Sequence, residues 1–430
     1  MSEWKEKEIG QICKVKGGKR LPAGKEFAEG ITPFPYLRVK DMVNGTIDSS
    51  ELEYVTPEIE PAIRTYKISK EDLYVTIAGT LGMFGSIPDY LDNAQLTENA
   101  AKLCEIDLSE FDKDFLKYYL NSELIKTQVN KEIGVGGGVP KLALFRIEKL
   151  IVKYPHQTIQ GIIAHILRKA DNIIDKTQFS IDKYKAIKRG MLHDLFTRGI
   201  DNKTGKLRPK FDDAPEFYKE SKLGMIPKEW EVQEFFQSCE LITDGSHFSP
   251  KPLEFGEIIV NVKDMGEFGI KYDNCTRIST KDFIELKKQN CSPQYNDVLL
   301  SKDGTIGRII LFKDDRDIVI LSSIAILRTS NKLSPEYFYT FMKSEYFEEQ
   351  LIVKISGSAL KRIVLRDINS LLIANPIDIE EQKFISDRII QIENKIHSEQ
   401  NYLHKLQQIK SGLMGDLLSG KKKVKVGSKM

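Results

Sequence analysis

The chain has 430 residues, which is more than one hydrophobic core usually organises, so we expect at least two domains. Its 41% hydrophobic and 29% charged residues are typical of folded, water-soluble proteins and argue against extensive disorder. No apolar run approaches the roughly 20 residues of a membrane helix, and the charged residues 1–10 lack the apolar core of a secretion signal, so we expect a cytoplasmic protein.

The cysteines, the histidines and the charge distribution do not indicate a specific ligand. Five scattered cysteines favour reduced thiols over a disulfide framework, and neither they nor the six histidines show the spacing of a metal site, so we expect no metal. The net charge of +2 does not indicate a nucleic-acid partner. Positive charge does gather between Lys183 and Lys210 and in the last ten residues, where solvated helix ends explain it as well as phosphate contact does.

An internal repeat is the strongest feature of the sequence. Short matches recur in the same order at offsets of 221 to 226 residues, which indicates duplication or fusion of one ancestral unit. A period of this size corresponds to a whole domain and excludes a solenoid of short repeats, so we expect two similar domains. The matches include Trp4 with Trp230, residues 39–42 with 262–265 (Val-Lys-Asp-Met), residues 79–82 with 304–307 (Gly-Thr-x-Gly), and residues 150–155 with 371–376.

The first 150 or so residues of each copy predict a mixed α/β (α+β) domain with an irregular sheet. Short β-branched or aromatic runs alternate there with Gly, Pro, Asn and Asp. Two helices interrupt this pattern, one over 115–131 and one over 335–353, the second with Ser334 as N-cap and Pro335 in its first turn. The expected strands include 36–39, 73–77, 258–262, 298–300 and 318–321.

The end of each copy predicts a long helix. Residues 157–198 and 379–420 contain no proline, and their apolar residues alternate at spacings of four and three, which is typical of a coiled coil. About 42 residues form a helix of roughly 60 Å. The seams consist of Ile163, Leu167, Ala170, Ile174, Thr177, Ile181, Tyr184, Lys188, Met191 and Leu195, and of Ile385, Ile389, Ile392, Ile396, Glu399, Leu403, Leu406, Lys410, Leu413 and Leu417.

A narrow seam of this length favours one partner helix, and the other copy supplies it. We therefore expect an antiparallel pair with the two globular parts at opposite ends, related by an approximate twofold axis. The alternative is that each helix packs on its own domain. Two similar domains separated by a stiff spacer suggest a device that measures the distance between two sites on DNA, as symmetric helix-turn-helix dimers do.

Several motifs resemble the specificity (S) subunits of type I restriction-modification systems. The likeness is strongest at the junction of the two copies and extends over essentially the whole chain. It rests on residues 195–201 (Leu-Phe-Thr-Arg-Gly-Ile-Asp), 205–209 (Gly-Lys-Leu-Arg-Pro), 221–230 (Ser-Lys-Leu-Gly-Met-Ile-Pro-Lys-Glu-Trp), 244–250 (Asp-Gly-Ser-His-Phe-Ser-Pro), 297–301 (Asp-Val-Leu-Leu-Ser), 304–307 (Gly-Thr-Ile-Gly) and 380–382 (Glu-Glu-Gln). The first copy departs from the family pattern at residues 76–78 and 154–160, which affects the expected contacts at the start of its helix.

The resemblance implies that the chain reads a split, asymmetric DNA sequence. Its segments would be a first target-recognition domain (1–156), a first conserved helical spacer (157–205), a second target-recognition domain (206–378), and a second helical spacer with a basic tail (379–430). It further implies docking to two modification (methyltransferase) subunits that use S-adenosylmethionine, and to restriction subunits that use ATP and Mg²⁺. No catalysis and no cofactor would then reside in this chain.

Candidate DNA contacts are loop residues that can donate hydrogen bonds to phosphates or base edges. Where the two copies agree, folding or backbone contact is favoured over base reading, because two different half-sites require different reading residues. The candidates are Lys19, Arg20, Arg38, Lys40, Thr80 and Lys141 in the first copy, and His247, Lys251, Lys263, Ser301, Lys302, Lys361 and Arg362 in the second.

Catalytic alternatives find little support in the sequence. Residues 375–378 (Asn-Pro-Ile-Asp) lack the second Pro and the aromatic residue of an amino-methyltransferase tetrapeptide. The glycine-rich residues 134–141 lack the Gly-Lys-Ser/Thr ending of a phosphate loop, so we expect a flexible loop that approaches DNA. A scaffold whose coiled coil only joins protein partners remains the alternative function.

Overall fold

The computed structural model describes residues 4–132, 140–356 and 362–424, and it divides into two compact units. The first unit combines residues 1–177 with 402–430, and the second consists of residues 178–401. Each unit therefore contains one globular head and parts of both long helices. The glycine-rich loop predicted at 134–141 lies outside the described residues except for its last two positions.

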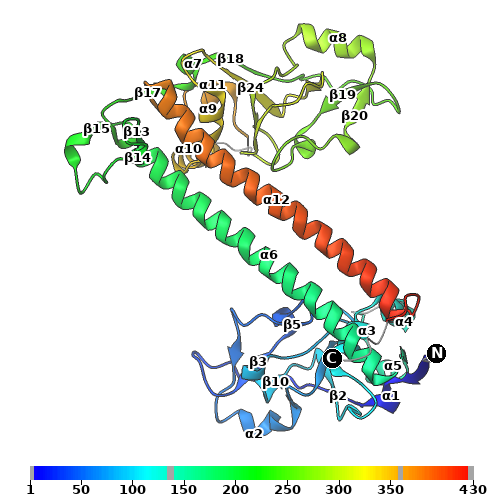
Figure 1. Ribbon diagram of the computed structural model, residues 1–430. Helices are drawn as coiled ribbons and strands as arrows, with labels where there is room; N and C mark the ends of the chain where they lie inside the picture. The colour runs from blue at the N-terminus through cyan, green and yellow to red at the C-terminus, as the bar shows by residue number, and fades with distance from the viewer. Residues whose placement is uncertain (1–3, 133–139, 357–361, 425–430) are drawn as a thin grey trace. The chain divides into compact units, whose positions relative to one another are not determined.

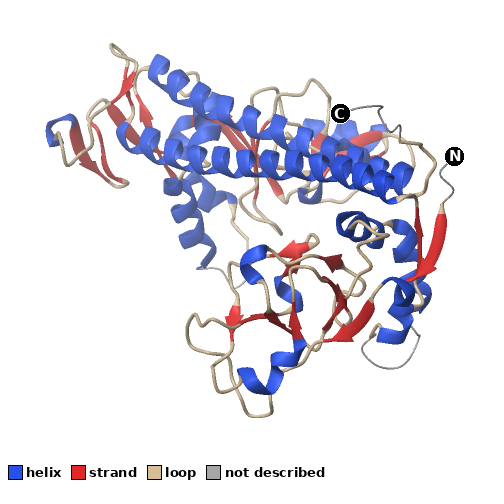
Figure 2. Ribbon diagram, turned by 60° about the horizontal axis from the view of Figure 1, so that its bottom comes forward, coloured by secondary structure: helices blue, strands red, loops and turns tan. Residues whose placement is uncertain are grey.

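The first head is built from small sheets flanked by short helices (Figures 1 and 2). Its main antiparallel sheet has the order β2-β11-β8-β9, and a second sheet, β6-β3-β10-β7, contains the parallel pair β3 and β10. The elements are β1 (Lys5–Glu8), α1 (Ile9–Ile12), β2 (Lys14–Gly17), β3 (Pro35–Leu37), β4 (Met42–Val43), β5 (Thr46–Ile47), β6 (Glu53–Tyr54), α2 (Glu60–Ile63), β7 (Lys67–Ile68), β8 (Leu73–Thr76), β9 (Phe84–Gly85), β10 (Ala94–Leu96), β11 (Ala100–Cys104), α3 (Lys113–Leu120), α4 (Glu123–Glu132), α5 (Leu144–Glu148) and β12 (Ile151–Tyr154).

The second head repeats this plan. Its main sheet, β18-β24-β21-β22, corresponds strand by strand to that of the first head, and β19 and β23 form the matching parallel pair. The elements are β13 (Ile200–Asp201), β14 (Lys206–Leu207), β15 (Tyr218–Ser221), β16 (Gly224–Pro227), β17 (Trp230–Glu234), α7 (Phe235–Ser238), β18 (Cys239–Asp244), β19 (Glu257–Val260), β20 (Thr276–Ile278), α8 (Thr280–Lys288), β21 (Val298–Ser301), β22 (Ile309–Leu311), β23 (Val319–Ile320), β24 (Ile324–Thr329), α9 (Pro335–Phe341), α10 (Glu345–Ser356), α11 (Leu365–Asn369) and β25 (Leu372–Pro376). The predicted mixed α/β fold with irregular sheets is confirmed.

The two predicted head helices were wrong in one respect, since each is a pair of shorter helices. In the first head α3 ends at Leu120, and Asn121 turns its side-chain amide back to the Lys117 carbonyl and across to the Phe84 carbonyl. In the second head α9 ends at Phe341 and α10 begins at Glu345. The predicted N-cap is correct, because the Ser334 hydroxyl accepts a hydrogen bond from the Tyr337 amide.

The long helices α6 (Gln157–Arg198) and α12 (Ile379–Leu418) are confirmed. Their predicted seam residues are buried or half-buried, including Ile174 and Leu403, and the positions between them are largely exposed. Within the second unit Lys188 pairs with Glu393 and Lys395 lies over the Tyr184 ring, so the two helices run antiparallel there. The arrangement of the two units about a twofold axis stays a prediction.

The polar interruptions of the seams are all satisfied. The Thr177 hydroxyl donates to the Ile173 carbonyl one turn earlier, and Glu399 pairs with Lys395 on its own helix. Lys188 and Lys410 instead reach acidic residues of the opposite helix, Glu393 and Asp171. The polar positions that weaken the coiled-coil pattern therefore do not leave unpaired charges inside it.

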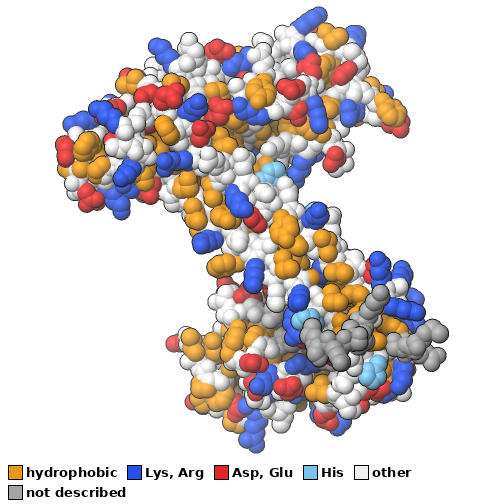
Figure 3. Space-filling view, in the orientation of Figure 1, with side chains coloured by type: hydrophobic (Ala, Val, Ile, Leu, Met, Phe, Trp, Pro, Cys, Tyr) orange, Lys and Arg blue, Asp and Glu red, His pale blue; other side chains and the backbone are white. Residues whose placement is uncertain are grey.

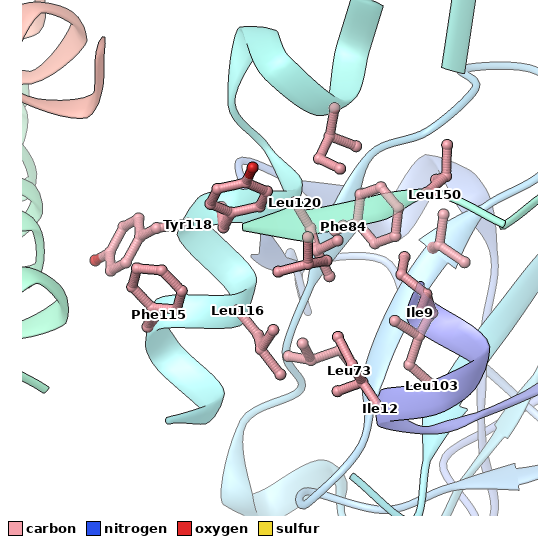
Figure 4. Packing of buried hydrophobic residues seen from close by; sticks show 14 of the residues in the cluster. Ile9, Ile12, Leu73, Phe84, Leu103, Phe115, Leu116, Tyr118, Leu120 and Leu150 are labelled. Carbon is pink, nitrogen blue, oxygen red and sulfur yellow. The ribbon is translucent and has the colours of Figure 1, made fainter. Parts of the chain in front are cut away.

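Each main core joins a head to the end of a helix from the other copy. In the first unit Leu417 and Leu418 of α12 pack into the core around α1 and α3, part of which Figure 4 shows, with Leu116 beside Leu73. In the second unit Leu195 and Phe196 of α6 occupy the matching place. Burial of these apolar side chains thus ties the last turn of each helix to a head.

Candidate nucleic-acid interface

A buried glutamine connects each head to the start of its long helix. In the first unit the Gln160 side chain accepts from the Asp112 amide at 2.9 Å and donates to the Glu110 and Pro155 carbonyls. In the second unit Gln382 makes the same three bonds with Ser334, Lys332 and Pro376. Since both side chains have 0% exposure, these bonds fix the direction in which the helix leaves the head.

The strands and turns that carry several candidate residues are also equivalent in the two heads. In each head a Gly-Thr-x-Gly turn, residues 79–82 or 304–307, follows an inner strand of the main sheet, β8 or β21, and its first two residues are exposed. Lys141 forms an isolated bridge with Ala78 beside the first turn, and Arg362 forms one with Asp303 beside the second. The structure thus brings Thr80 and Lys141 to one place in the first head.

The other candidates of the first head lie on separate loops. Lys19 and Arg20 are exposed in the loop after β2, where Arg20 lies 3.5 Å from Glu98 and the Lys19 ammonium lies over the Tyr66 ring. Lys40 is exposed and pairs with Glu51. All three present a cation to solvent, as a DNA contact requires.

In the second head four described candidates are exposed: His247, Lys251, Lys263 and Arg362. His247 lies 3.3 Å from the Asp244 carboxylate in the loop after β18. Lys361 lies outside the described residues.

Three candidates serve the fold. Arg38 donates to Asp41 and pairs with Glu53, with only 19% of its side chain exposed. Ser301 is buried and donates its hydroxyl to the Thr305 carbonyl, and buried Lys302 pairs with Asp244 at 3.1 Å. Because these donors are already used inside the head, we assign them to holding the loops.

The loops after β2 and β18 both begin at a tightly packed glycine. A Cβ added at Gly18 would overlap the Thr97 carbonyl, and one added at Gly245 would overlap the Ile320 carbonyl. In the second head the Ser246 hydroxyl then makes hydrogen bonds to both the amide and the carbonyl of Phe248. Close packing therefore fixes the base of each loop.

Sequence reasoning missed two aromatic residues in the second loop. Phe248 is 65% exposed and Phe255 is 79% exposed, and both lie in the loop after β18. Their position between Gly, Ser and Pro residues was the available signal. The first loop carries Leu21 at the position matching Phe248, where it packs on a small core. At this position the two loops differ, with an exposed aromatic ring in the second head and a half-buried aliphatic side chain in the first.

A buried ion pair marks the junction between the copies. Glu381 accepts from both terminal nitrogens of Arg208, at 2.5 and 2.9 Å, from the Trp230 indole at 3.0 Å and from the Ile200 amide at 2.9 Å. Burial opposes the charge of Arg208, but its bonds to Glu381 raise its pKa above the usual value. The first copy has Ile159 at the position of Glu381, which is the departure noted in the sequence.

The described residues contain no group of three or more His, Cys, Asp or Glu side chains placed to hold a metal ion. The five cysteines, all of which lie in described segments, are unpaired. Of the helices that the structure describes, none has the length and apolar character needed to cross a membrane.

Comparison with known sequences identifies similar proteins over nearly the full chain. A family model described as type I restriction modification DNA specificity domain matches residues 1–183 and 227–408, one match in each copy of the repeat. The putative type I restriction enzyme MjaX specificity subunit of Methanocaldococcus jannaschii is 24% identical, over 98% of this chain and 94% of the relative. The type I restriction enzyme EcoBI specificity subunit of Escherichia coli is 21% identical, over 90% of this chain and 79% of the relative.

Solved structures show the same fold. A crystal structure of a type I restriction-modification S subunit from M. genitalium superposes with a TM-score of 0.62 at 14% identity, over 97% of this chain and 96% of that one. A second chain, from a study of complex assembly and conformational transition of the type I R-M system, gives a TM-score of 0.52 at 14% identity, with 96% and 97% covered.

Proposed function

Since this chain belongs to the family of type I restriction-modification DNA specificity domains, we propose that it binds a bipartite, asymmetric DNA target with one head on each half-site. The main support for the proposal is that the two heads share one framework of sheets and turns but differ in the loops attached to it. The two heads repeat their sheets, turns and buried glutamines, while the loops after Gly17 and Gly245 differ in length and side chains. Two different loops on one framework suit two half-sites of different sequence.

The helices would carry the partner proteins. Ile187 on α6 and Ile409 on α12 hold matching positions in the two copies, and both are exposed at 40% and 48%. Because both copies expose an isoleucine at this position, we take it as the place where a protein partner contacts each helix. Their equivalence supports two copies of one partner, which we propose are two modification (methyltransferase) subunits, with restriction subunits joining the complex.

Within such a complex this chain would contribute recognition, and the partners would contribute catalysis. S-adenosylmethionine would bind the modification subunits, and ATP and Mg²⁺ would serve the restriction subunits. The exposed cations of the two heads, such as Lys19 and Lys251, would then act on DNA as hydrogen-bond donors.

A salt-titrated binding selection tests the proposal. The chain is purified with its modification subunit and offered a duplex library with two randomised blocks at variable spacing. We expect enrichment of one bipartite sequence with a fixed spacer. No preference for any bipartite sequence, with the complex intact, would leave the scaffold that only joins protein partners as the better description.

Helix length provides an independent test. Deleting one heptad from both α6 and α12 keeps the seam in phase and should shorten the tolerated spacer while leaving both half-sites unchanged. The same selection measures the spacer, and an unchanged spacer would refute the idea that the helices set it.

A further inference from the structure

Two motifs that the copies share meet at one surface point in each head. The Gly-Thr-x-Gly turn lies against the Val-Lys-Asp-Met segment: an ideal Cβ on Gly79 would lie 3.9 Å from Val39, and one on Gly304 would lie 3.6 Å from Val262. The lysines of that segment, Lys40 and Lys263, are both exposed. Residues far apart in sequence, but alike between copies, thus gather around one exposed turn in each head.

The base of each turn is rigid. In the first head the Thr76 carbonyl accepts from the Gly82 amide, and the Thr76 hydroxyl accepts from the Met83 amide. In the second head Ser301 does the same for Gly307 and Arg308. The third residue of each turn, Leu81 or Ile306, packs against the main core of its head.

The tip of each turn has hydrogen-bond donors for which no described residue is the acceptor. The hydroxyls of Thr80 and Thr305 are exposed, and they make no hydrogen bond to any described residue. The same is true of the backbone amides of Thr80 and Leu81, and of Thr305 and Ile306, within the described segments. The backbones of Lys141 and Arg362 form β-bridges with Ala78 and Asp303, the residues just before the two turns, so an exposed cationic residue lies beside each turn. Adjacent amides, a hydroxyl and a cation form a set that suits a phosphate oxygen.

Folding alone does not account for the shared threonine. The rigid base needs Thr76 or Ser301, the glycine at 82 or 307, and the apolar third residue, whereas no hydrogen bond between described residues uses the exposed threonine hydroxyl. Base reading does not account for it either, because two different half-sites would require different residues. The sugar-phosphate backbone is what two half-sites of different sequence present alike, and its phosphates carry the negative charge that a neighbouring cation binds.

We propose that the two Gly-Thr-x-Gly turns are phosphate anchors, each of which holds one DNA backbone phosphate of its half-site through the Thr hydroxyl, the neighbouring amides and Lys141 or Arg362. The anchors place the diverged loops over the bases and carry no sequence information themselves. This inference rests on the proposed DNA-binding function and assigns a distinct task to the shared surface.

The test combines two pairs of substitutions in the full chain with its modification subunit. Thr80→Val with Thr305→Val removes only the hydroxyls, and Lys141→Ala with Arg362→Ala removes only the cations. Lys153→Ala with Lys219→Ala, exposed lysines on β12 and β15, is the matched control. Thermal unfolding of each variant verifies that the heads remain folded.

The salt dependence of binding gives the decisive readout. Each lost phosphate contact should lower the slope of log affinity against log salt by about 0.9, so Lys141→Ala with Arg362→Ala should lower it by roughly 1.8. Thr80→Val with Thr305→Val should weaken binding severalfold at all sequences. The selected half-sites should stay the same in both variants, and the control should match the wild type.

Other outcomes separate the two ideas. A changed half-site sequence would make the turns base readers, and an unchanged slope and affinity would remove them from the interface; either result overturns the anchors. If the wild type shows no bipartite preference, the proposed function fails. In that case the wild type and Lys141→Ala with Arg362→Ala are compared on a duplex of arbitrary sequence, because phosphate contact does not depend on sequence. The slope of log affinity against log salt should still be lower in the variant if the turns are phosphate anchors.

Discussion

The two junctions between head and helices each combine a tyrosine, an acidic residue and a lysine, but the second junction is more deeply buried. In the first unit the Tyr118 hydroxyl donates to Asp171 of α6 at 2.6 Å, and Lys410 of α12 pairs with the same carboxylate. In the second unit Tyr339 donates to Glu393 of α12 at 2.9 Å, and Lys188 of α6 pairs with it at 2.5 Å. Each acid thus connects a head helix to both long helices.

The second junction is buried and carries one more charge. The Glu393 side chain is 6% exposed, against 29% for Asp171, and Lys343 adds a second ammonium 2.7 Å from Glu393. The first copy has Asn121 at the position of Lys343. A repeated framework therefore does not imply equal stability, because the cost of an unpaired charge rises with burial.

The largest effect should come from the ion pair that only the second copy has. Glu381→Ala would leave Arg208 buried without a partner, and we expect a loss of about 3–5 kcal/mol in the unfolding free energy of the second unit. Unfolding in urea, followed by amide hydrogen exchange in each unit separately, measures this loss of unfolding free energy. Glu380→Ala, at an exposed neighbour, is the control, and a loss under about 1 kcal/mol would contradict the expectation.

The buried glutamines should give effects of equal size in both units. Gln160→Ala and Gln382→Ala each leave one amide and two carbonyls unpaired, and we expect about 3 kcal/mol from either one. The same exchange experiment compares them. A difference greater than about 1 kcal/mol would show that the shared framework is not equivalent in the two heads.

Lys343 should make the stability of the second unit depend on pH. Burial lowers its pKa to about 8 from 10.5, although Glu393 opposes this shift and Lys188 reinforces it. Between about pH 8 and 10.5 the unfolded chain therefore binds more protons than the folded one, so this residue makes stability rise with pH across that window.

Substitution of Lys343 isolates this contribution. Relative to Lys343→Met, the wild type should gain at most about 3 kcal/mol between pH 8 and 10.5. Urea unfolding at several pH values gives the difference, and the first unit, with Asn121, should show no matching change. Parallel curves for the wild type and the variant would refute the assignment.

The smallest effects should come from the two tyrosines. Tyr118→Phe should cost about 1 kcal/mol and Tyr339→Phe roughly 2 kcal/mol, because the second hydroxyl donates to the more buried carboxylate. Tyr90→Phe, at an exposed site, serves as the control. Equal losses of unfolding free energy for Tyr118→Phe and Tyr339→Phe would show that the deeper burial of the second junction does not strengthen its hydrogen bond.

Local patterns in the sequence determined much of this architecture. The repeat, the two long helices with their seams, and the mixed character of the heads follow from spacing and composition, which depend only on neighbouring residues. The exposure of Thr80 and Lys141 was also predicted from loop chemistry. The breaks after Leu120 and Phe341 were not, because a helix break enforced by packing leaves no Gly or Pro to mark it.

Only the tertiary structure decided which of the candidate donors remain exposed. Arg38, Ser301 and Lys302 read as surface donors in the sequence, yet partners from other strands and turns occupy them. The junction of Tyr339, Glu393 and Lys188 joins residues more than 50 positions apart. Such contacts depend on how distant elements pack, and no local pattern records that packing. The sequence by itself determined the repeated framework, and the packing of side chains determined where the two copies differ.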